Sequence, residues 1–375
     1  MAAHPRLRVA VDVAPLLGER TGIGHVTARL VEGLAARPDV TVTGYAISRT
    51  ARRDLEGVLP AGARPATSWL PARIVHPAWA RTGRPRIEHW TGPVDVVHAP
   101  NFVAPPARAP VIVSVHDLAF VHHPELCRPE AARLEPQLRR VLARGAVVHT
   151  GSDHVAEEIR AHFGLPTERV VRVYSGIATP AVRGDAATGR TLAGGDRYVL
   201  AIGTIEPRKG LPGLVRAFDL LAGEDPDVRL VIAGADGWGV EALSAAIAGA
   251  RAAHRVVRLG YVADADHSAL LAGASVLAYP SLYEGFGHPP FEAMAAGVPV
   301  VTTNAGSLPE VVGDAAVFVD PADDVALADA LRRVLDDAAL RATLVARGRG
   351  RVDAFPWSTA IDGFVELYRR VAATG

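Results

Sequence analysis

Short apolar runs alternate with helical periods along most of this chain, and this alternation restricts the fold more than any other feature of the sequence. In the second half, six runs read as buried strands: Tyr198–Gly203, Val228–Gly234, Val256–Leu259, Ser275–Tyr279, Pro299–Thr302 and Val317–Asp320. Helical patterns separate them, and strands that are joined through helices pair in parallel. The second half therefore predicts a doubly wound parallel sheet with helices on both faces.

The first half of the chain shows the same alternation. Strands are expected at Leu7–Val13, Val40–Ala46, Val94–His98, Pro110–Val115, Ala146–Thr150 and Val170–Tyr174, and helices at His25–Ala36, Ala131–Arg144 and Val155–Phe163. Residues 51–92 mix short elements and carry little signal. Residues 176–196 are rich in Gly, Ala and Pro without periodicity, which is typical of a linker. We therefore predict a first domain over residues 1–178, a second over 179–355 and a last helix within 356–375.

Composition restricts the class of protein. The 375 residues accommodate two domains more easily than one. Forty basic residues balance forty acidic ones, so no basic excess argues for nucleic acid as a partner. Cys127 is the one cysteine, which rules out an internal disulfide and fits a reducing compartment. No apolar stretch reaches about 20 residues and the start lacks a signal-peptide core, so we expect a cytoplasmic protein with at most peripheral membrane contact.

Residues 279–299 combine the features of a ligand site. A proline ends the apolar strand, and Gly285 and Gly287 then allow the backbone to approach a ligand closely. Two prolines follow, which suit the first turn of a helix, and the start of a helix points free N–H groups at an anion. Glu284 and Glu292 can accept hydrogen bonds from hydroxyl groups. This stretch therefore predicts a ligand with both phosphates and hydroxyls, such as a nucleotide sugar.

A second loop between a strand and a helix, Gly203–Leu211, carries the adjacent cations Arg208 and Lys209. Two cations at the start of a helix can clamp a diphosphate, the arginine through two parallel hydrogen bonds and the lysine as a point charge. They would also stabilise the charge that develops as a nucleoside diphosphate leaves. The alternative is a solvated basic pair, although the helix dipole disfavours cations at this position.

His116 and Asp117 directly follow the strand Pro110–Val115. Polar groups just beyond the carboxyl end of a parallel strand face the ligand crevice in open α/β sheets. An isolated histidine is more often a structural residue, and the position at the strand end is what favours a functional role here.

A glycine loop that contains Gly22, Ile23 and Gly24 follows the first strand. The third glycine of the G-x-G-x-x-G pattern is missing because Thr27 occupies its place, so an NAD site is disfavoured. No G-x-x-x-x-G-K-[ST] motif occurs, which excludes a P-loop. A tight turn without a ligand remains the alternative for this loop.

The two glutamates with seven residues between them, the Gly-Phe-Gly after the first, and Ser307-Leu-Pro-Glu310 downstream resemble the retaining glycosyltransferases of family 4. The resemblance covers nearly the whole chain. It implies an α/β protein of the GT-B fold, in which two doubly wound Rossmann-like parallel-sheet domains face each other across a cleft. The first domain would take the acceptor, the second would bind the nucleotide sugar donor, and the terminal helix would cross back to the first.

The resemblance also assigns roles to residues. Arg208 and Lys209 bind the donor diphosphate, although many members carry an arginine where this chain has Thr204. Glu292 binds the ribose hydroxyls of the nucleotide. Glu284 and the N–H groups of Phe286, Gly287 and His288 hold the sugar hydroxyls and the α-phosphate, and the backbone at Val262 reads the base. His116 contacts the transferred sugar, with Asp117 as its orienting partner. The wall of the cleft near the acceptor is assigned to Gly22, Ile23 and Gly24.

The resemblance favours same-face attack with retention of configuration, in which the leaving phosphate takes the proton of the acceptor. By its chemistry alone, Glu284 is also a candidate nucleophile. No Asp-x-Asp motif stands at a strand end, so activity without a metal or other cofactor is expected.

The donor and the acceptor are open at this point. The Glu-Pro-Arg-Lys sequence resembles that of mannosyltransferases that use GDP-mannose, and a UDP-sugar is the second choice. Glycans, lipid-linked intermediates and natural products are the expected acceptors. The alternatives to a transferase are a protein that binds a nucleotide sugar without transferring it, and an epimerase or a phosphorylase of the same fold.

Overall fold

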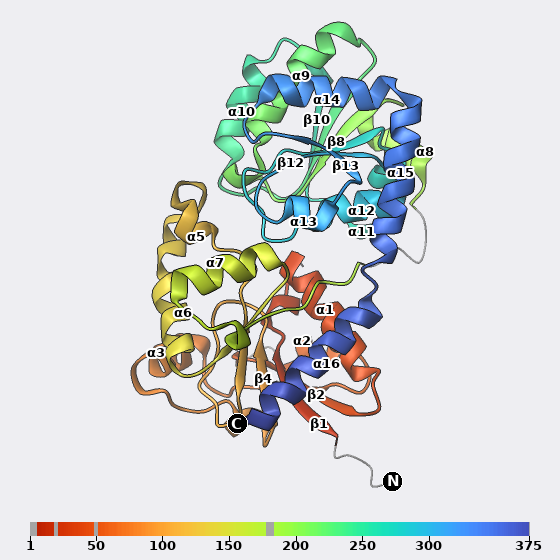
Figure 1. Cartoon of the computed structure of the whole chain (residues 1–375). Helices are drawn as coiled ribbons and strands as arrows, with labels where there is room; N and C mark the ends of the chain where they lie inside the picture. The colour runs from red at the N-terminus through yellow and green to blue at the C-terminus, as the bar shows by residue number, and fades with distance from the viewer. Residues whose placement is uncertain (1–5, 19–21, 49–51, 178–183, 375) are drawn as a thin grey trace. The chain divides into compact units, whose positions relative to one another are not determined.

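The computed structural model describes residues 6–18, 22–48, 52–177 and 184–374, and its chain divides into two compact units (Figure 1). The first unit comprises residues 1–118, 130–176 and 357–375, and the second comprises residues 119–129 and 177–356. The sequence analysis assigned residues 119–129 to the first domain. They belong to the second unit because their side chains and carbonyls contact it, as His123 does at Tyr283 and Leu126 at Trp238.

The first unit is built on a seven-stranded parallel sheet in the order β3-β2-β1-β4-β5-β6-β7. Its strands are β1 Leu7–Asp12, β2 Val40–Ala46, β3 Arg64–Thr67, β4 Val96–Ala99, β5 Val111–Ser114, β6 Val147–Thr150 and β7 Val170–Arg172. Its helices are α1 Gly22–Ala35, α2 Arg52–Val58, α3 Ala72–Thr82, α4 Glu88–Thr91, α6 Leu134–Ala143, α7 Asp153–Phe163 and α16 Trp357–Thr374. The direction of winding reverses between β1 and β4, the position at which open α/β sheets bind ligands.

The second unit has a six-stranded parallel sheet in the order β10-β9-β8-β11-β12-β13. Its strands are β8 Tyr198–Ile202, β9 Arg229–Ala233, β10 Val256–Gly260, β11 Val276–Tyr279, β12 Val300–Thr303 and β13 Ala316–Val319. Its helices are α5 Ala119–His122, α8 Ala186–Ala193, α9 Leu211–Glu224, α10 Val240–Gly249, α11 Asp264–Gly273, α12 His288–Ala296, α13 Leu308–Val312, α14 Asp324–Asp336 and α15 Ala338–Asp353. Here the winding reverses between β8 and β11.

Two doubly wound parallel sheets are thus confirmed, and three local expectations need correction. Helix α1 begins at Gly22 instead of His25, so Gly22, Ile23 and Gly24 form its first turn rather than a loop. The expected linker 176–196 contains α8, because the side chain of Asp185 caps that helix by accepting the N–H groups of its first turn. The helix expected from Ala131 starts as a 3-10 turn over residues 129–133 and becomes α-helical at Leu134.

Helix α16 packs on α1 and shares the core of the first unit, with Phe364 and Tyr368 fully buried. It is joined to the sheet by a chain of buried hydrogen bonds. Tyr368 Oη lies 2.7 Å from His98 Nδ1, and His98 Nε2 lies 2.8 Å from Ser114 Oγ. Ser114 Oγ lies 2.8 Å from His149 Nδ1, and His149 Nε2 lies 3.2 Å from the carbonyl oxygen of Val173.

The carbonyl at the end of this chain fixes the direction of every bond in it. Because the carbonyl of Val173 can only accept, His149 must carry its proton on Nε2 and accept the Ser114 hydroxyl at Nδ1. His98 then donates from Nε2 to Ser114 and accepts the Tyr368 hydroxyl at Nδ1. These directions hold for neutral imidazoles, the form that burial favours for both rings. Burial lowers the pKa of His98 well below its ordinary value and that of His149 to about 3.

Removing the Tyr368 hydroxyl should destabilise the protein, since it leaves His98 Nδ1 buried without a donor. We expect Tyr368→Phe to lower the free energy of unfolding by about 1–3 kcal/mol in urea denaturation. Tyr45→Phe is the matched control, because the buried Tyr45 hydroxyl has no hydrogen-bond partner among the described residues and its loss should cost nothing. Equal losses in the two variants would contradict the bonding chain.

The neutral histidines should also make stability depend on pH. The unfolded chain protonates a histidine near pH 6.5, whereas folded His149 does so only at about 3. Between these values the unfolded state binds the additional proton, so the free energy of unfolding should fall as the pH is lowered, by about 1.4 kcal/mol per pH unit for each such histidine. Urea denaturation at pH 7, 6 and 5 measures this slope. His149→Gln should flatten it, and an unchanged slope in that variant would refute a neutral buried His149.

Candidate active site

The residues predicted to bind a donor lie on the two loops that follow β8 and β11. These strands are neighbours at the centre of the second sheet, and their loops lead to α9 and α12. Gly210 ends a 3-10 turn, Pro207–Lys209, and packs directly on the other loop: a β-carbon at Gly210 would lie 2.3 Å from the carbonyl oxygen of Pro280. This close approach holds the loop of Arg208 and Lys209 against the loop of Glu284.

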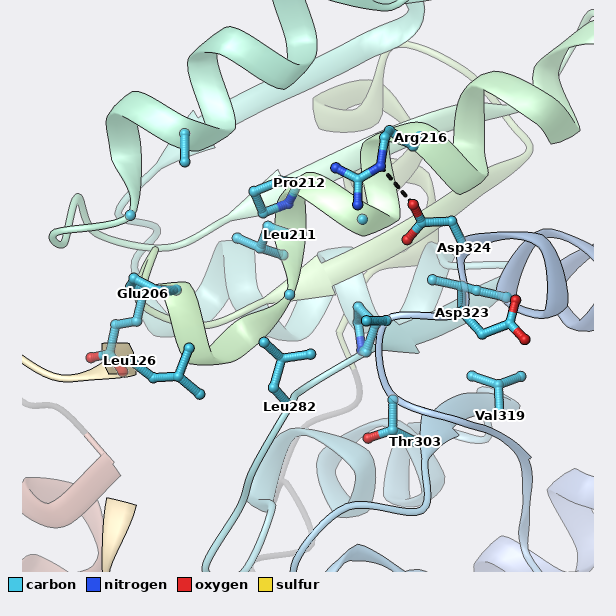
Figure 2. Close-up of a pocket in the computed structure, with 18 of the residues that line it drawn as sticks. Leu126, Glu206, Leu211, Pro212, Arg216, Leu282, Thr303, Val319, Asp323 and Asp324 are labelled. Carbon is cyan, nitrogen blue, oxygen red and sulfur yellow. Dashed lines mark hydrogen bonds and ion pairs between the residues drawn. The ribbon is translucent and has the colours of Figure 1, made fainter. Parts of the chain in front are cut away.

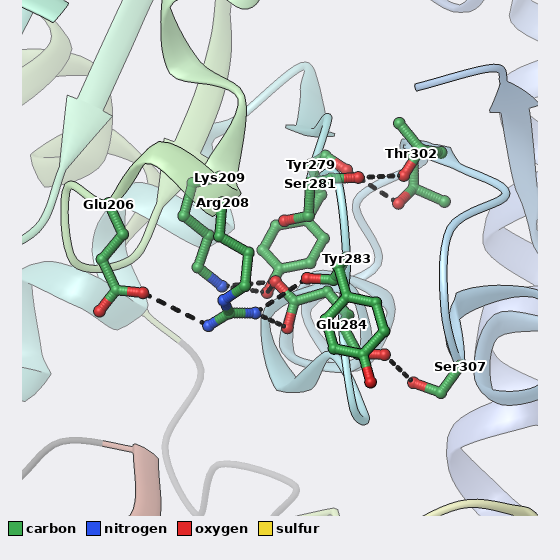
Figure 3. A network of polar contacts seen from close by, with 10 residues as sticks. Glu206, Arg208, Lys209, Tyr279, Ser281, Tyr283, Glu284, Thr302 and Ser307 are labelled. Carbon is green, nitrogen blue, oxygen red and sulfur yellow. Dashed lines mark hydrogen bonds and ion pairs between the residues drawn. The ribbon is translucent and has the colours of Figure 1, made fainter. Parts of the chain in front are cut away.

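The carboxylate of Glu284 lies between the two cations (Figure 3). Its Oε2 is 2.6 Å from Arg208, and its Oε1 is 2.7 Å from Lys209 Nζ. Arg208 also donates to the carbonyl of Tyr283 at 3.0 Å and lies 3.4 Å from Glu206 Oε2. The sequence analysis predicted all three residues of the central cluster for one ligand, and the structure brings them into direct contact.

Tyr279, the last residue of β11, completes this network and was missed by the sequence analysis. Lys209 Nζ donates to the Tyr279 hydroxyl at 2.6 Å and lies 4.7 Å from the centre of its ring. The hydroxyl in turn donates to Glu284 Oε1 at 2.8 Å. The position of Tyr279 at a strand end, directly before a proline, was the available signal.

Burial and charge act against each other at these groups. Burial alone would raise the pKa of Glu284, but the charges of Arg208 and Lys209 outweigh it, and the pKa lies below its ordinary value. Burial lowers the pKa of Lys209, and the attraction of Glu284 opposes this only in part. The carboxylate is therefore ionised at neutral pH and is held by two cations.

The backbone around Glu284 is fixed from two sides. The carbonyl of Glu284 accepts the backbone N–H of Ser307 at 2.9 Å and its hydroxyl at 3.1 Å. Gly287 has a φ of 94° and caps α12, a conformation that residues with a β-carbon rarely adopt. Phe286 is buried, and its ring is stacked on that of Phe291. His288 is the first residue of α12.

Glu292 lies one turn into α12, and its side chain is partly exposed. Its Oε2 lies 3.4 Å from His267 Nε2 on α11. Burial lowers the pKa of His267, but the hydrogen bond and the charge of Glu292 outweigh it and the net pKa is raised. The sequence analysis gave His267 no role. Val262 lies in the loop that leads from β10 to α11, two residues before that helix begins.

The other predicted residues belong to the first unit. His116 follows β5 by two residues, and its Nε2 donates to the carbonyl of Pro100 at 2.7 Å, which leaves Nδ1 as an acceptor. Burial lowers the pKa of His116, so the ring is neutral; the Pro100 carbonyl and the charge of Asp117 oppose this shift. Gly22 lies in the first turn of α1, whose N–H groups have no partners within the helix.

A pocket of about 280 Å³ lies where the first turns of α9 and α14 meet the ends of β12 and β13 (Figure 2). Its lining is mainly apolar, and Arg216 pairs with Asp324 in it at 2.6 Å. The lining includes Glu206 but neither Arg208 nor Lys209, so the residues predicted to bind a donor do not gather there. No three side chains of the types His, Cys, Asp and Glu come together as metal ligands in the described residues.

Two family profiles match this chain. The profile described as Glycosyl transferases group 1 matches residues 187–351, and the one described as Glycosyltransferase Family 4 matches residues 20–180. The first match contains both loops of the candidate site, and the second contains His116.

Individual proteins are similar over most of the chain. The O-antigen chain mannosyltransferase B of Escherichia coli is 33% identical over 281 residues, which cover 73% of this chain and 74% of that protein. A glycogen synthase of Mycobacterium tuberculosis is 34% identical over 291 residues, with 73% and 68% covered. The sucrose-phosphate synthase structure from Thermosynechococcus elongatus has a TM-score of 0.76 at 21% identity, with 99% and 100% of the two chains covered, and it shows the same fold.

The conformation of Gly287 can be tested by substitution. We expect Gly287→Ala to lower the free energy of unfolding by about 1–3 kcal/mol, because φ is 94° and the added β-carbon would lie 2.8 Å from Leu308 Cδ2. Gly223→Ala, at an exposed position near the end of helix α9 with open space around the new methyl, should instead stabilise by about 0.5–1 kcal/mol. Urea denaturation of both variants measures these changes. If Gly287→Ala left the free energy of unfolding unchanged, the strained conformation of this loop would be ruled out.

Proposed function

Since this chain belongs to the family 4 glycosyltransferases and has their GT-B fold, we propose that it moves a hexose from a nucleoside diphosphate sugar to a hydroxyl group of an acceptor. The observation that carries the proposal is the pair Arg208 and Lys209, held against Glu284 at the reversal of winding between β8 and β11. Cations at this edge of an open sheet suit a diphosphate. Glu292, one turn into the adjoining helix, suits the ribose.

Mannose from GDP-mannose is our first choice of donor. The name of the Escherichia coli relative supports it, because that protein is a mannosyltransferase and is 33% identical to this chain. A different donor, such as a UDP-sugar, is the alternative, since a protein named as a glycogen synthase is 34% identical. The same relative that suggests mannose suggests a glycan acceptor, free or linked to a lipid.

The proposed reaction retains the configuration of the sugar and needs no metal. The acceptor oxygen attacks the anomeric carbon on the face that the phosphate leaves, and the breaking C–O bond gives its electron pair to the phosphate. A phosphate oxygen takes the acceptor proton. Arg208 and Lys209 stabilise the charge that develops on the diphosphate, which is the work that a metal does in other transferases. Neutral His116 accepts a sugar hydroxyl at Nδ1 and so orients the sugar.

The reaction is proposed to take place in the cytoplasm, at the membrane surface if the acceptor is linked to a lipid. Across the ranges that the structure describes, none of the helices combines the length and the apolar character needed to cross a bilayer. A nucleotide-sugar-binding protein that transfers nothing, and an epimerase or a phosphorylase of this fold, are the competing functions.

The donor is tested by thermal unfolding with GDP, UDP, ADP and dTDP, on the wild type and on Glu292→Ala. A nucleotide present at about 100 times its dissociation constant should add about 2.7 kcal/mol to the stability of the wild type. We expect GDP to give this shift and Glu292→Ala to lose it. A shift with none of the four nucleotides would count against a nucleotide site.

The chemistry is tested by product analysis with GDP-mannose and a mannan oligosaccharide, with and without EDTA. A transferase yields GDP and a longer glycan whose new linkage NMR identifies as α, whereas an epimerase keeps the nucleotide sugar intact and a phosphorylase requires phosphate. A β linkage would exclude retention. Loss of activity in EDTA that is restored by a divalent cation would exclude the metal-free mechanism.

A further inference from the structure

The cations that are proposed to hold the diphosphate are already neutralised within the protein. Arg208 and Lys209 contribute two positive charges, and Glu284 and Glu206 contribute two negative ones. Glu284 makes the closest contacts, at 2.6 Å to Arg208 and 2.7 Å to Lys209, whereas Glu206 lies 3.4 Å from Arg208. The carboxylate of Glu284 thus stands where the phosphate oxygens of a donor would bind.

Burial explains why the empty site needs this carboxylate. The side chains of Arg208 and Lys209 are only 17% and 13% exposed, and that of Glu284 is 7% exposed. Charges with so little access to water are costly unless an opposite charge and hydrogen bonds compensate them. Glu284 supplies that compensation, and its own two oxygens are satisfied by the same contacts.

We propose that Glu284 is an internal counterion, which occupies the cation clamp in the empty enzyme and is displaced by the diphosphate of the donor. This inference rests on the proposed function. Ser307 holds the backbone carbonyl of Glu284 through two hydrogen bonds, so we expect the loop to stay in place during displacement. Rotation of the Glu284 side chain is sufficient.

Tyr279 makes the displaced state accessible. Its hydroxyl donates to Glu284 Oε1 independently of the cations, so the carboxylate keeps one donor when Lys209 turns to a phosphate. The second oxygen is then free to accept a hydroxyl of the transferred sugar. Donor binding therefore converts Glu284 from a counterion into a ligand of the sugar.

The same exchange assists the last step of a turnover. A diphosphate that leaves would expose two buried cations, and Glu284 can return to them at that moment. The carboxylate therefore weakens the binding of the product, which otherwise would remain on the clamp.

The test is isothermal titration of GDP and UDP into the wild type, Glu284→Gln and Asp324→Asn. The glutamine keeps the shape of the side chain but removes the competing charge, so we expect Glu284→Gln to bind the diphosphate roughly tenfold more tightly while its rate of transfer falls. Asp324→Asn is the matched control, because Asp324 is also paired with an arginine of the second unit, Arg216 at 2.6 Å, and does not contact the clamp. Its affinity should equal that of the wild type.

The number of phosphates provides a second criterion. The gain in Glu284→Gln should be largest for GDP, smaller for GMP and absent for guanosine, since guanosine has no charge that competes with Glu284. Glu284→Asp keeps the charge but withdraws it by one methylene, and it should show a smaller gain of the same sign even if the glutamine variant does not fold.

The outcomes separate this inference from the proposed function. If neither GDP nor UDP binds to any of the proteins, the proposed donor class is wrong and the counterion role falls with it. If a diphosphate binds to the wild type but binds equally or more weakly to Glu284→Gln and Glu284→Asp, or if the gain is as large for guanosine, the counterion role alone is refuted.

Discussion

The reversal of winding at the central strands of each sheet decides where this molecule presents polar groups. At β8 and β11 the two connections diverge to opposite faces of the sheet, so the loops that follow these strands meet at the edge between them. Two loops of quite different composition meet there, one with Arg208 and Lys209 and the other with Glu284 and two glycines. The topology of the second unit thus determines where these charged side chains meet, and the buried core of the sheet keeps their loops in position.

Charge neutrality is the second constraint at this edge. A clamp for a diphosphate must be cationic when the donor is bound, yet buried cations are unfavourable when it is absent. In the structure the two cations are paired with the carboxylate of Glu284, which also accepts the Tyr279 hydroxyl. If Glu284 is the proposed counterion, the stability of the empty protein and its affinity for a diphosphate oppose each other in this one cluster.

The sequence predicted what depends on local pattern. Strands buried on both faces are continuous apolar runs, so β8 and β11 were found almost to the residue. The edge strand β3, with the sequence Arg-Pro-Ala-Thr, has no such pattern and was missed. Arg208, Lys209 and Glu284, which were predicted for one ligand, lie on loops that directly follow strands, and the structure brings these three into contact. Tyr279 and His267 were missed because their partners are set by contacts in space, which spacing along one chain does not show.

Residues 119–129 belong to the second unit although the segments before and after them belong to the first, and this increases the number of connections between the units. The backbone passes from one unit to the other at 118/119, 129/130, 176/177 and 356/357. A single proteolytic cut between residues 176 and 184 would therefore leave the units covalently joined through the other three crossings. Neither unit corresponds to one continuous piece of the gene, so the second unit in isolation would have to be expressed without its own 119–129 segment or as a circularly permuted chain.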